Sequence, residues 1–300
     1  MSLWAIGLVV ISAFLHAGWN LLSKSNKSSG KAFFLSSSAA ASLMLLPYVI
    51  WYLHDINYAS LSPSFWWVLL ISGVAQVIYL ISLGIAYKHG DIGVIYPIAR
   101  ALPVLMVGVG TALLGYHLSL TVWVGFFLIT AGCLLVPIVS LKQFHIAQYA
   151  NTGVLWALVA AIGTMGYSIL DKEALVILVR ELANLTTESY LAIYYLALQF
   201  WVIFAVIALY LIVTRQWNEF REAWKIRKPS AMAGAMMAMT YGMVLYAMTM
   251  TENVSYVVAL RQMSIVFGMI FGVVLLKERF SLTRSIGASF IFIGLVMTVV

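Results

Sequence analysis

The sequence predicts an all-α polytopic membrane protein with ten transmembrane helices, arranged as two inverted five-helix repeats around a central cavity. Hydrophobic residues make up 63% of the 300 residues and charged residues only 9%, whereas soluble domains carry roughly 25% charged residues. Apolar runs of about 20 residues, the length that crosses a bilayer, recur along the chain. The alternating ten-residue segments that are typical of a transmembrane β-barrel are not visible in the sequence.

Ten apolar runs predict the ten membrane spans. They fall at residues 3–22, 32–53, 64–86, 92–114, 119–140, 152–170, 188–213, 230–250, 254–276 and 282–300. The longest connections between them are 171–187 and 214–229. The second of these places Trp217, Phe220 and Trp224 at helical spacing, which predicts a short amphipathic helix at the membrane interface.

One stretch of the chain, Val254–Leu282, has a counterpart in the first half. The counterpart, Gly93–Leu120, is also an apolar run with a single arginine inside it. Arg100 and Arg261 are 161 positions apart. The same spacing, or a spacing one residue longer, relates the pairs Asp91/Glu252, Ser119/Ser281, Gly125/Gly287 and Gly132/Gly294. These matches predict an internal repeat.

A second pair of segments extends the repeat to the first span. Ser12–Ser25 matches Ala160–Glu173 at a spacing of 148 residues. The matched pairs are Ala13/Ala161, Gly18/Gly166, Trp19/Tyr167, Leu22/Leu170 and Lys24/Lys172. The chain therefore divides into residues 1–145 and 146–300, with five predicted spans in each unit. Because five is an odd number, the two units must cross the membrane in opposite directions, as in the inverted repeats of secondary transporters.

The distribution of basic residues predicts the orientation. The connections after the odd-numbered spans contain 13 Lys and Arg residues, whereas the opposite connections contain only Lys172 and Arg180. The acids on that opposite side are Asp55, Asp171, Glu173, Glu181, Glu188 and Glu252. This bias predicts a multi-pass protein of a cell membrane, such as the bacterial inner membrane, with both termini extracytoplasmic. It also explains the net charge of +7, so no nucleic-acid partner is predicted.

The two arginines inside apolar runs are the main candidates for a substrate site. Arg100 and Arg261 lie at similar depths in repeat-related spans, and charges within a membrane are functional by default. Their planar guanidinium groups suit bidentate binding of a carboxylate or a phosphonate. Alternatively, each arginine satisfies backbone carbonyls of a broken helix, or pairs with Asp91 or Glu252. Pro97 and Pro103 flank Arg100 and predict a kink in the fourth span.

Other polar and aromatic residues complete the predicted substrate site. They are Trp19, Asn20, Gln76, Tyr79, Tyr241 and Gln262. His16 shares a helix face with Asn20 and is the candidate for proton coupling, because its unperturbed pKa lies near neutrality. The alternatives are an interhelical hydrogen bond for His16 and interfacial packing for the tyrosines. Gly268-x-x-x-Gly272 predicts a close contact between helices.

Several chemistries have no signal in the sequence. No G-x-x-x-x-G-K motif occurs, so ATP hydrolysis by this chain is not predicted. The five histidines are scattered and no metal site or other cofactor is predicted. No paired carboxylates and no Ser/His/Asp set indicate an enzyme. Cys133 is the only cysteine, which excludes an intrachain disulfide.

Three short motifs carry a family resemblance. They are HAGWN at His16–Asn20 with Lys24 following, Tyr167 with Asp171-Lys172, and LLKERFS at Leu275–Ser281. Together they resemble the EamA branch of the drug/metabolite transporter superfamily, over essentially the whole chain. The resemblance implies ten helices in two inverted repeats around a cavity, and secondary transport, often export, of amino acids or other small metabolites. The family's glutamate at the end of the fourth span would fall at Tyr116-His117, so only Glu278 represents that pair.

These observations predict a secondary active transporter, an exporter of a small polar metabolite such as an amino acid, a related zwitterion or an organic anion. The small-molecule substrate and membrane lipids are the expected partners, and the chain is expected to act as a monomer or a homodimer. A carrier of quaternary amines or cationic drugs is the alternative within transport, although two arginines disfavour a purely cationic ligand. The alternative from another class is a membrane-embedded lipid-processing enzyme.

The predicted orientation can be tested with C-terminal fusions. Because both termini are predicted to be extracytoplasmic, a C-terminal alkaline phosphatase fusion should be enzymatically active and a C-terminal green fluorescent protein fusion should be dark. The opposite pattern would reverse the assigned orientation.

Overall fold

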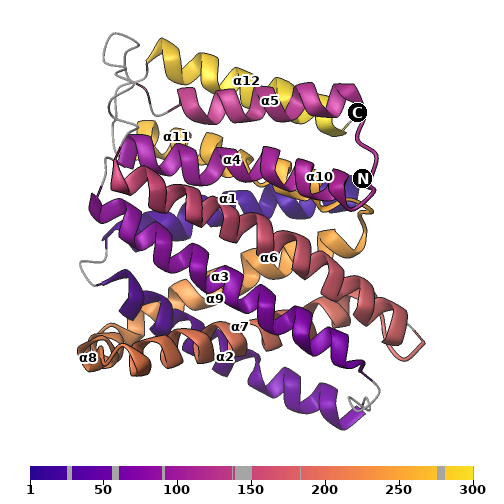
Figure 1. The fold of residues 1–300 in the computed structure, drawn as a ribbon, viewed down its shortest axis with the longest axis vertical. Helices are drawn as coiled ribbons and strands as arrows, with labels where there is room; N and C mark the ends of the chain where they lie inside the picture. Colours follow the sequence, from indigo (N-terminus) through magenta and orange to yellow (C-terminus); the bar gives the residue numbers. More distant parts are fainter. Residues whose placement is uncertain are drawn as a thin grey trace.

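The computed structural model describes residues 1–25, 29–55, 61–89, 92–136, 138, 151–182, 184–275 and 281–299. Within these ranges the regular secondary structure is entirely helical (Figure 1). The helices are α1 (Leu3–Ser25), α2 (Gly30–Asp55), α3 (Pro63–His89), α4 (Ile92–Leu113), α5 (Leu120–Leu135), α6 (Thr152–Leu182), α7 (Glu188–Val213), α8 (Trp217–Lys225), α9 (Arg227–Thr249), α10 (Val254–Leu260), α11 (Met263–Leu275) and α12 (Leu282–Val299).

The helices have the length and composition of membrane spans, which confirms the prediction of an all-α membrane protein. In the described part of the chain, seven helical segments are long and apolar enough to cross a bilayer. Three further apolar stretches, Leu3–Ala17, Ile98–Leu113 and Leu120–Leu135, are shorter. Figure 1 shows the long helices side by side, with both termini at one end of the molecule and α8 at the other.

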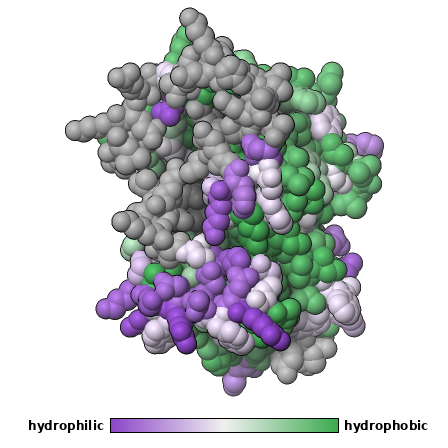
Figure 2. Space-filling view, turned by 60° about the vertical axis from the view of Figure 1, so that its left-hand side comes forward, coloured by the Kyte–Doolittle hydropathy of each residue, from purple (hydrophilic) through white to green (hydrophobic). Residues whose placement is uncertain are grey.

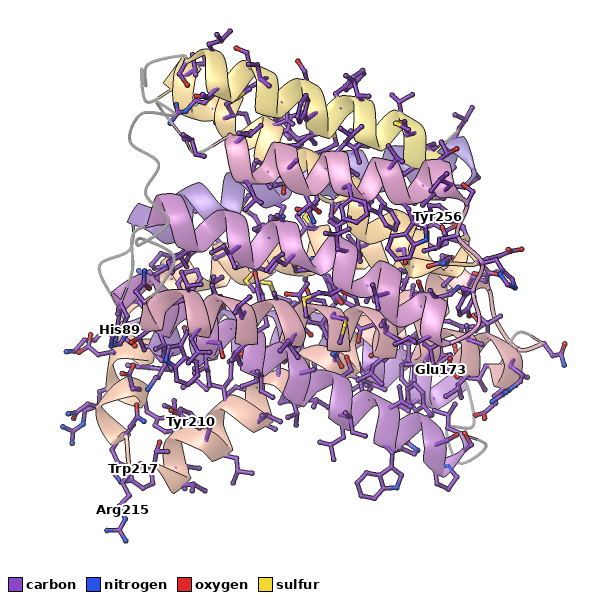
Figure 3. All side chains as sticks on the ribbon, turned by 45° about the horizontal axis from the view of Figure 1, so that its top comes forward. His89, Glu173, Tyr210, Arg215, Trp217 and Tyr256 are labelled. Carbon is purple, nitrogen blue, oxygen red and sulfur yellow. The ribbon has the colours of Figure 1, made fainter. Side chains whose placement is uncertain are left out.

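The two ends of the helices differ in their side chains. His89, Tyr210, Arg215 and Trp217 lie at the end that carries α8, whereas Glu173 lies at the end with the termini (Figure 3). Figure 2 shows hydrophilic residues gathered over the lower part of one face, with a hydrophobic flank beside them. We call the end of the molecule that carries α8 the α8 end, and the opposite end, which carries both termini, the terminal end.

The predicted interfacial helix is confirmed as a helix, α8. The residues Trp217 and Trp224 are 57% and 69% exposed. The helix has the acidic Glu219 in its first turn and the basic Lys225 in its last turn. Lys225 bonds Glu222 at 2.6 Å, and the Arg227 guanidinium lies 4.7 Å from the centre of the Trp224 ring. Exposed tryptophans next to basic residues are typical of a helix that lies in the membrane interface.

The sixth helix is longer than predicted, and the predicted connection at 171–187 is wrong. Helix α6 continues through Asp171 to Leu182, a length of about 46 Å at 1.5 Å per residue. The charged triplet Asp171-Lys172-Glu173 suggested the end of a span. However, the following residues to Leu182 contain neither Gly nor Pro and are mostly apolar, so nothing interrupts the helix.

The ninth predicted span is interrupted, so that α10 and α11 replace one continuous helix. At the interruption, the Gln262 N–H donates to Ala259 O at 3.0 Å and the Ser264 N–H donates to Arg261 O at 3.1 Å. These are i→i−3 bonds, which tighten the chain relative to an α-helix. The repeat-related α4 is continuous, although it contains Pro97 and Pro103. The break therefore lies at Arg261-Gln262 in the second half and not at the prolines of the first.

Helix pairs recur in the two halves of the chain. Helix α3 packs against α6, and α9 packs against α1. Helix α4 also contacts α6, and α11 contacts α1. In the sequence repeat, α1 corresponds to α6, α3 to α9, and α4 to α10–α11. When these partners are exchanged, the α3–α6 contact becomes the α9–α1 contact, and the α4–α6 contact becomes the α11–α1 contact. Helices α2 and α7 pack on each other, as do α5 and α12.

Glycines allow α5 and α12 to touch through their backbones. A Cβ atom on Gly132 would lie 2.5 Å from Gly287 O, and one on Gly125 would lie 2.7 Å from Gly294 O. Because Gly125 corresponds to Gly287 and Gly132 to Gly294, each contact is the image of the other when the halves are exchanged. A two-fold relation between two surfaces requires this reciprocity.

The glycine pair predicted to give close helix packing behaves differently. A Cβ atom on Gly268 would meet nothing within 4 Å. The Gly268 position therefore makes no close helix contact in this structure, and the surroundings of Gly272 are not described.

The α5–α12 contact generates a stability prediction. Gly132→Ala should lower the apparent Tm, because overpacking a close contact costs about 1–3 kcal/mol. Gly268→Ala is the matched control, since its methyl group would enter open space. Thermal unfolding in detergent, followed by tryptophan fluorescence, measures both variants. Equal Tm values for the two variants would contradict the described contact.

Candidate functional site

A cavity of about 60 Å³ lies between the two halves of the chain, where α1, α2, α3, α6, α7 and α9 surround the α10–α11 break. Its polar lining residues are His16, Ser38, Gln76, Tyr79, Tyr167, Thr240, Tyr241 and Arg261. A smaller pocket adjoins it, sharing His16 and Arg261 and adding Ser12 and Arg100. We call the two together the central cavity. It brings together six of the predicted site residues: Arg100, Arg261, Gln76, Tyr79, Tyr241 and His16.

Arg261 forms one wall of the central cavity and comes from the break between α10 and α11. Its guanidinium carbon lies 5.7 Å from the centre of the Tyr241 ring and 6.0 Å from that of Tyr167. Its Nη2 donates to the Tyr167 hydroxyl at 3.3 Å. No described carboxylate lies within ion-pair distance of it, and Glu252, the partner considered from the sequence, is exposed. Among the described residues, the guanidinium is therefore contacted by aromatic faces and a phenol oxygen and forms no direct ion pair.

Three tyrosines from three helices form a row along the cavity. Tyr79 of α3 lies 5.9 Å from Tyr167 of α6, and Tyr167 lies 6.1 Å from Tyr241 of α9, measured between ring centres. The rings are inclined to each other, so faces as well as edges line the cavity. A ligand in the cavity would contact apolar ring surface and phenol oxygens beside a guanidinium group.

Arg100 has a different environment from Arg261, although the two arginines correspond in the repeat. It is buried on α4, and its Nη2 donates to Ser264 Oγ at 2.6 Å. Its Nε has no hydrogen-bond partner among the described residues. Asp91, the acid considered as its partner, lies outside the described residues. Arg100 thus ties the first half of the chain to the start of α11, directly after the break.

The remaining predicted site residues divide into three groups. Gln76 lines the cavity and its Oε1 accepts from Gln199 Nε2 at 3.0 Å. Gln262 is buried away from the central cavity, and its amide donates to Val258 O at 3.1 Å, across the interrupted turn. The side chains of Trp19 and Asn20 lie outside the described part of the chain.

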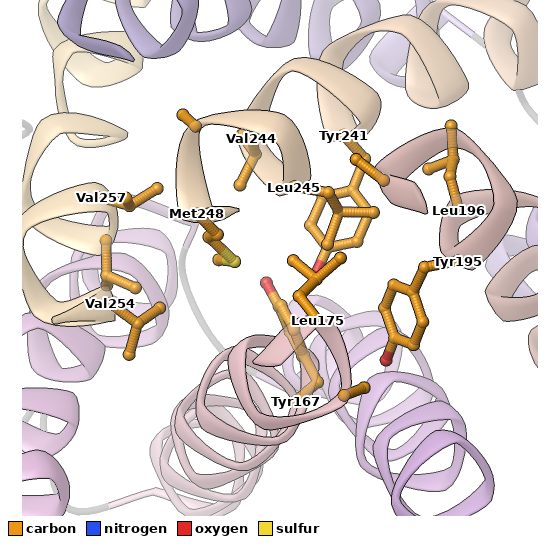
Figure 4. Packing of buried hydrophobic residues seen from close by; sticks show 14 of the residues in the cluster. Tyr167, Leu175, Tyr195, Leu196, Tyr241, Val244, Leu245, Met248, Val254 and Val257 are labelled. Atoms are coloured by element: carbon orange, nitrogen blue, oxygen red, sulfur yellow. The ribbon is translucent and has the colours of Figure 1, made fainter. Parts of the chain in front are cut away.

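Asp171 accepts more hydrogen bonds than any other acid in the described part of the chain, and the sequence does not predict this role. The sequence predicts an extracytoplasmic connection at Asp171, but the residue is fully buried within α6. Its Oδ1 accepts hydrogen bonds from Ser72 Oγ, from the Tyr195 hydroxyl at 2.6 Å and from Gln199 Nε2 at 3.3 Å. Its Oδ2 accepts from the Tyr241 hydroxyl. In Figure 4 the hydroxyl ends of Tyr195 and Tyr241 point toward the helix that carries Tyr167 and Leu175.

A signal for this cluster was present in the sequence. The run EALVILV, residues 173–179, continues the apolar pattern beyond Asp171. An acid inside a spanning helix marks a functional site by default. The neighbouring Lys172 also lies within the helix, and its Nζ donates to Met248 O at 2.9 Å and to Thr251 O at 2.6 Å. These carbonyls belong to the C-terminal end of α9, where helices leave acceptors unpaired and favour cations.

The two sides of the central cavity differ in packing. Toward the terminal end, beyond Asp171, the chain packs buried side chains that include Leu175, Leu245 and Met248 (Figure 4). Toward the α8 end a further cavity of about 30 Å³ shares Phe34 and Leu80 with the central cavity. Its lining includes Lys31 and Lys88. A second cavity with two basic residues therefore lies next to the central cavity on the side of the α8 end.

A larger hollow of the described surface lies elsewhere. It measures about 610 Å³ and lies at the terminal end, between α5 and α12. It is lined by Met1, Ser119, Tyr256 and the residues around Val296, without an acidic or basic side chain. The convergence of charged and aromatic groups makes the central cavity the better candidate site.

Comparisons with known proteins identify the fold and no family. No family model matches the chain, and no curated protein matches it. Solved structures do share its fold, and 28 chains match. One of them, described as "Crystal structure of protein", aligns with a TM-score of 0.63 at 17% identity and covers 98% of this chain and 97% of that chain. This similarity over nearly the whole length shows a common fold.

The Asp171 cluster predicts a stability effect. Tyr241→Phe removes the hydroxyl that donates to Asp171 Oδ2 and keeps the ring. A buried acceptor left without a partner costs about 1–3 kcal/mol, so the apparent Tm in detergent should fall. Tyr246→Phe is the matched control on the same helix, because no described residue bonds its hydroxyl. If both variants melt together, the hydrogen bond does not stabilise the fold.

Proposed function

We propose that this chain is a secondary active transporter for a small polar metabolite with an anionic group, such as an amino acid, a related zwitterion or an organic anion. The observation that carries the proposal is Arg261, which lines a cavity between the two halves without an acid partner among the described residues. A basic charge inside a membrane protein costs about 2.5–3.5 kcal/mol on insertion scales. A bound anion offsets this cost each time the cargo occupies the cavity.

The surroundings of Arg261 favour an anion over a cation. The guanidinium already lies against the rings of Tyr167 and Tyr241, where a quaternary amine would have to bind. Its planar group presents parallel N–H donors that match the two oxygens of a carboxylate. For a zwitterion, the Tyr79 ring and the Gln76 side-chain oxygen, which also line the cavity, offer groups that can contact an ammonium group.

The backbone arrangement supports a transporter with ten spans in two inverted five-helix repeats. The reciprocal glycine contacts between α5 and α12 are those of a two-fold relation between the halves. The break between α10 and α11 lies at the cavity, and interrupted helices at the interface of two repeats form substrate sites in secondary transporters. Both features belong to a carrier that exposes one site alternately to the two sides of a membrane.

The position of the neighbouring cavity supports loading of the cargo from the cytoplasm. This neighbouring cavity lies beside the central cavity at the α8 end, and Lys31 and Lys88 belong to its lining. In the predicted orientation this basic end faces the cytoplasm. An anionic cargo would then reach the cavity from the cytoplasm along a basic path, while buried packing at the terminal end separates it from the outside.

The proposal predicts the effect of a conservative substitution. Arg261→Lys keeps the charge and removes the planar fork, so binding of the cargo should weaken by about 1.5–3 kcal/mol, or roughly 10–150-fold in Kd. Arg100→Lys is the comparison and should have a smaller effect, because Ser264 already engages Arg100. A thermal-shift screen of amino acids, mono- and dicarboxylates and quaternary amines first selects a ligand, and titrations then give the Kd of each variant.

Uptake into proteoliposomes completes this test. A transporter accumulates the selected ligand inside the vesicles unchanged, whereas an enzyme converts it. Normal binding and uptake by Arg261→Lys, or selection of a quaternary amine in the screen, would overturn the anion assignment.

A further inference from the structure

Asp171 is a buried ionisable residue, and the proposed binding of an anion at Arg261 does not require it. Three neighbouring helices contribute its hydrogen-bond partners. Helix α7 contributes Tyr195 and Gln199, α9 contributes Tyr241, and α3 contributes Ser72, while the basic residues of α3, Lys88 and His89, lie in its last turn. The titratable and charged groups that face it are therefore Tyr195, Tyr241, the Tyr167 of its own helix, and Arg261 from the α10–α11 break. The adjacent Lys172 is engaged at the end of α9.

The hydrogen-bond partners of Asp171 suit both of its protonation states. Ser72, Tyr195 and Tyr241 each present a hydroxyl, which can donate to a carboxylate or accept from a carboxylic acid. The Gln199 amide nitrogen donates, and the buried Gln199 Oε1 has no partner among the described residues. The three hydroxyl groups can therefore reorient when Asp171 takes up a proton, and the cluster also contains one acceptor without a described partner.

Tyr241 connects this cluster to the central cavity. Its hydroxyl donates to Asp171 Oδ2, its ring lies under the Arg261 guanidinium at 5.7 Å, and it lines both parts of the cavity. The positive charge of Arg261 favours the ionised form of a nearby acid. An anion bound to Arg261 cancels that charge and thereby favours the protonated form. The effect is reciprocal, because a proton on Asp171 removes a negative charge that opposes anion binding.

We propose that Asp171 is a proton-binding site linked to the Arg261 site, so that cargo and proton are taken up together. This inference rests on the proposed function and deepens it by naming the residue that carries the proton. An anion and a proton that bind together add no net charge to the cavity, which lowers the electrostatic cost of moving the loaded site through the membrane. A proton on His16, by contrast, would add a third positive charge beside Arg100 and Arg261.

Infrared spectroscopy of the lipid-reconstituted protein tests the linkage. The carbonyl band of a protonated carboxylic acid is followed from about pH 9 to pH 4, the range that brackets carboxyl groups in buried sites. The full chain should give a buried-acid band that is absent in Asp171→Asn. Glu173→Gln, two residues away on an exposed position of the same helix, should retain the band.

Arg261→Gln supplies the decisive comparison, and it keeps Asp171 in place should Asp171→Asn fail to fold. Removing the guanidinium charge imitates the site neutralised by an anion, so the band should appear at higher pH, by about one pH unit. Arg215→Gln, at the exposed turn before α8, is the control and should leave the titration unchanged. A missing band, or a band whose midpoint is the same in Arg261→Gln and in the unaltered chain, would overturn the inference.

This titration uses no cargo, so its result is separate from that of the proposed function. An Arg261-dependent band together with a failed anion screen would count against the proposed cargo and not against the linkage. A successful anion screen with a band that ignores Arg261 would count against the linkage alone.

Discussion

The structure depends on how charged groups are compensated where water is excluded. A guanidinium or a carboxylate among apolar helices must find hydrogen bonds, an aromatic face or a charge of opposite sign. Here Asp171 gathers donors from three helices, and Arg261 rests on the rings of Tyr167 and Tyr241. Tyr241 of α9 contacts both groups, because its hydroxyl donates to Asp171 and its ring lies against Arg261. These two contacts together constrain how α9 packs against α6.

The two arginines occupy corresponding positions in the sequence repeat but have different local environments. Arg100 lies in a continuous helix and is engaged by Ser264, whereas Arg261 lies at a helix break and faces the cavity. The position that corresponds to Ser264 in the first half is Pro103, which has no hydroxyl to offer Arg261. The asymmetry therefore follows from side chains that the two halves do not share. Arg100 donates to a serine of the other half, whereas Arg261 lies against two aromatic rings.

Much of the fold could be predicted from the sequence, because long apolar runs show the helices directly in the sequence. The 161-residue spacing also predicts which helices of the two halves correspond. The same reasoning found Arg100, Arg261, Gln76, Tyr79 and Tyr241, which all border the central cavity. It failed where charge was taken as the end of a span. The donors for Asp171 come from α3, α7 and α9, so no local pattern around that residue shows that its burial is compensated. The interruption at Arg261-Gln262 was equally hidden, because those residues contain neither Gly nor Pro.

The glycine crossing of α5 and α12 has a mechanical consequence. Where backbone meets backbone at Gly132 and Gly287, no flexible side chain is present to absorb a displacement, and sliding one helix along the other would bring carbonyls into collision. The pair therefore forms a rigid unit. A relative movement of the two halves would have to take place among the remaining helices, about a crossing that contributes no residue to the lining of the central cavity.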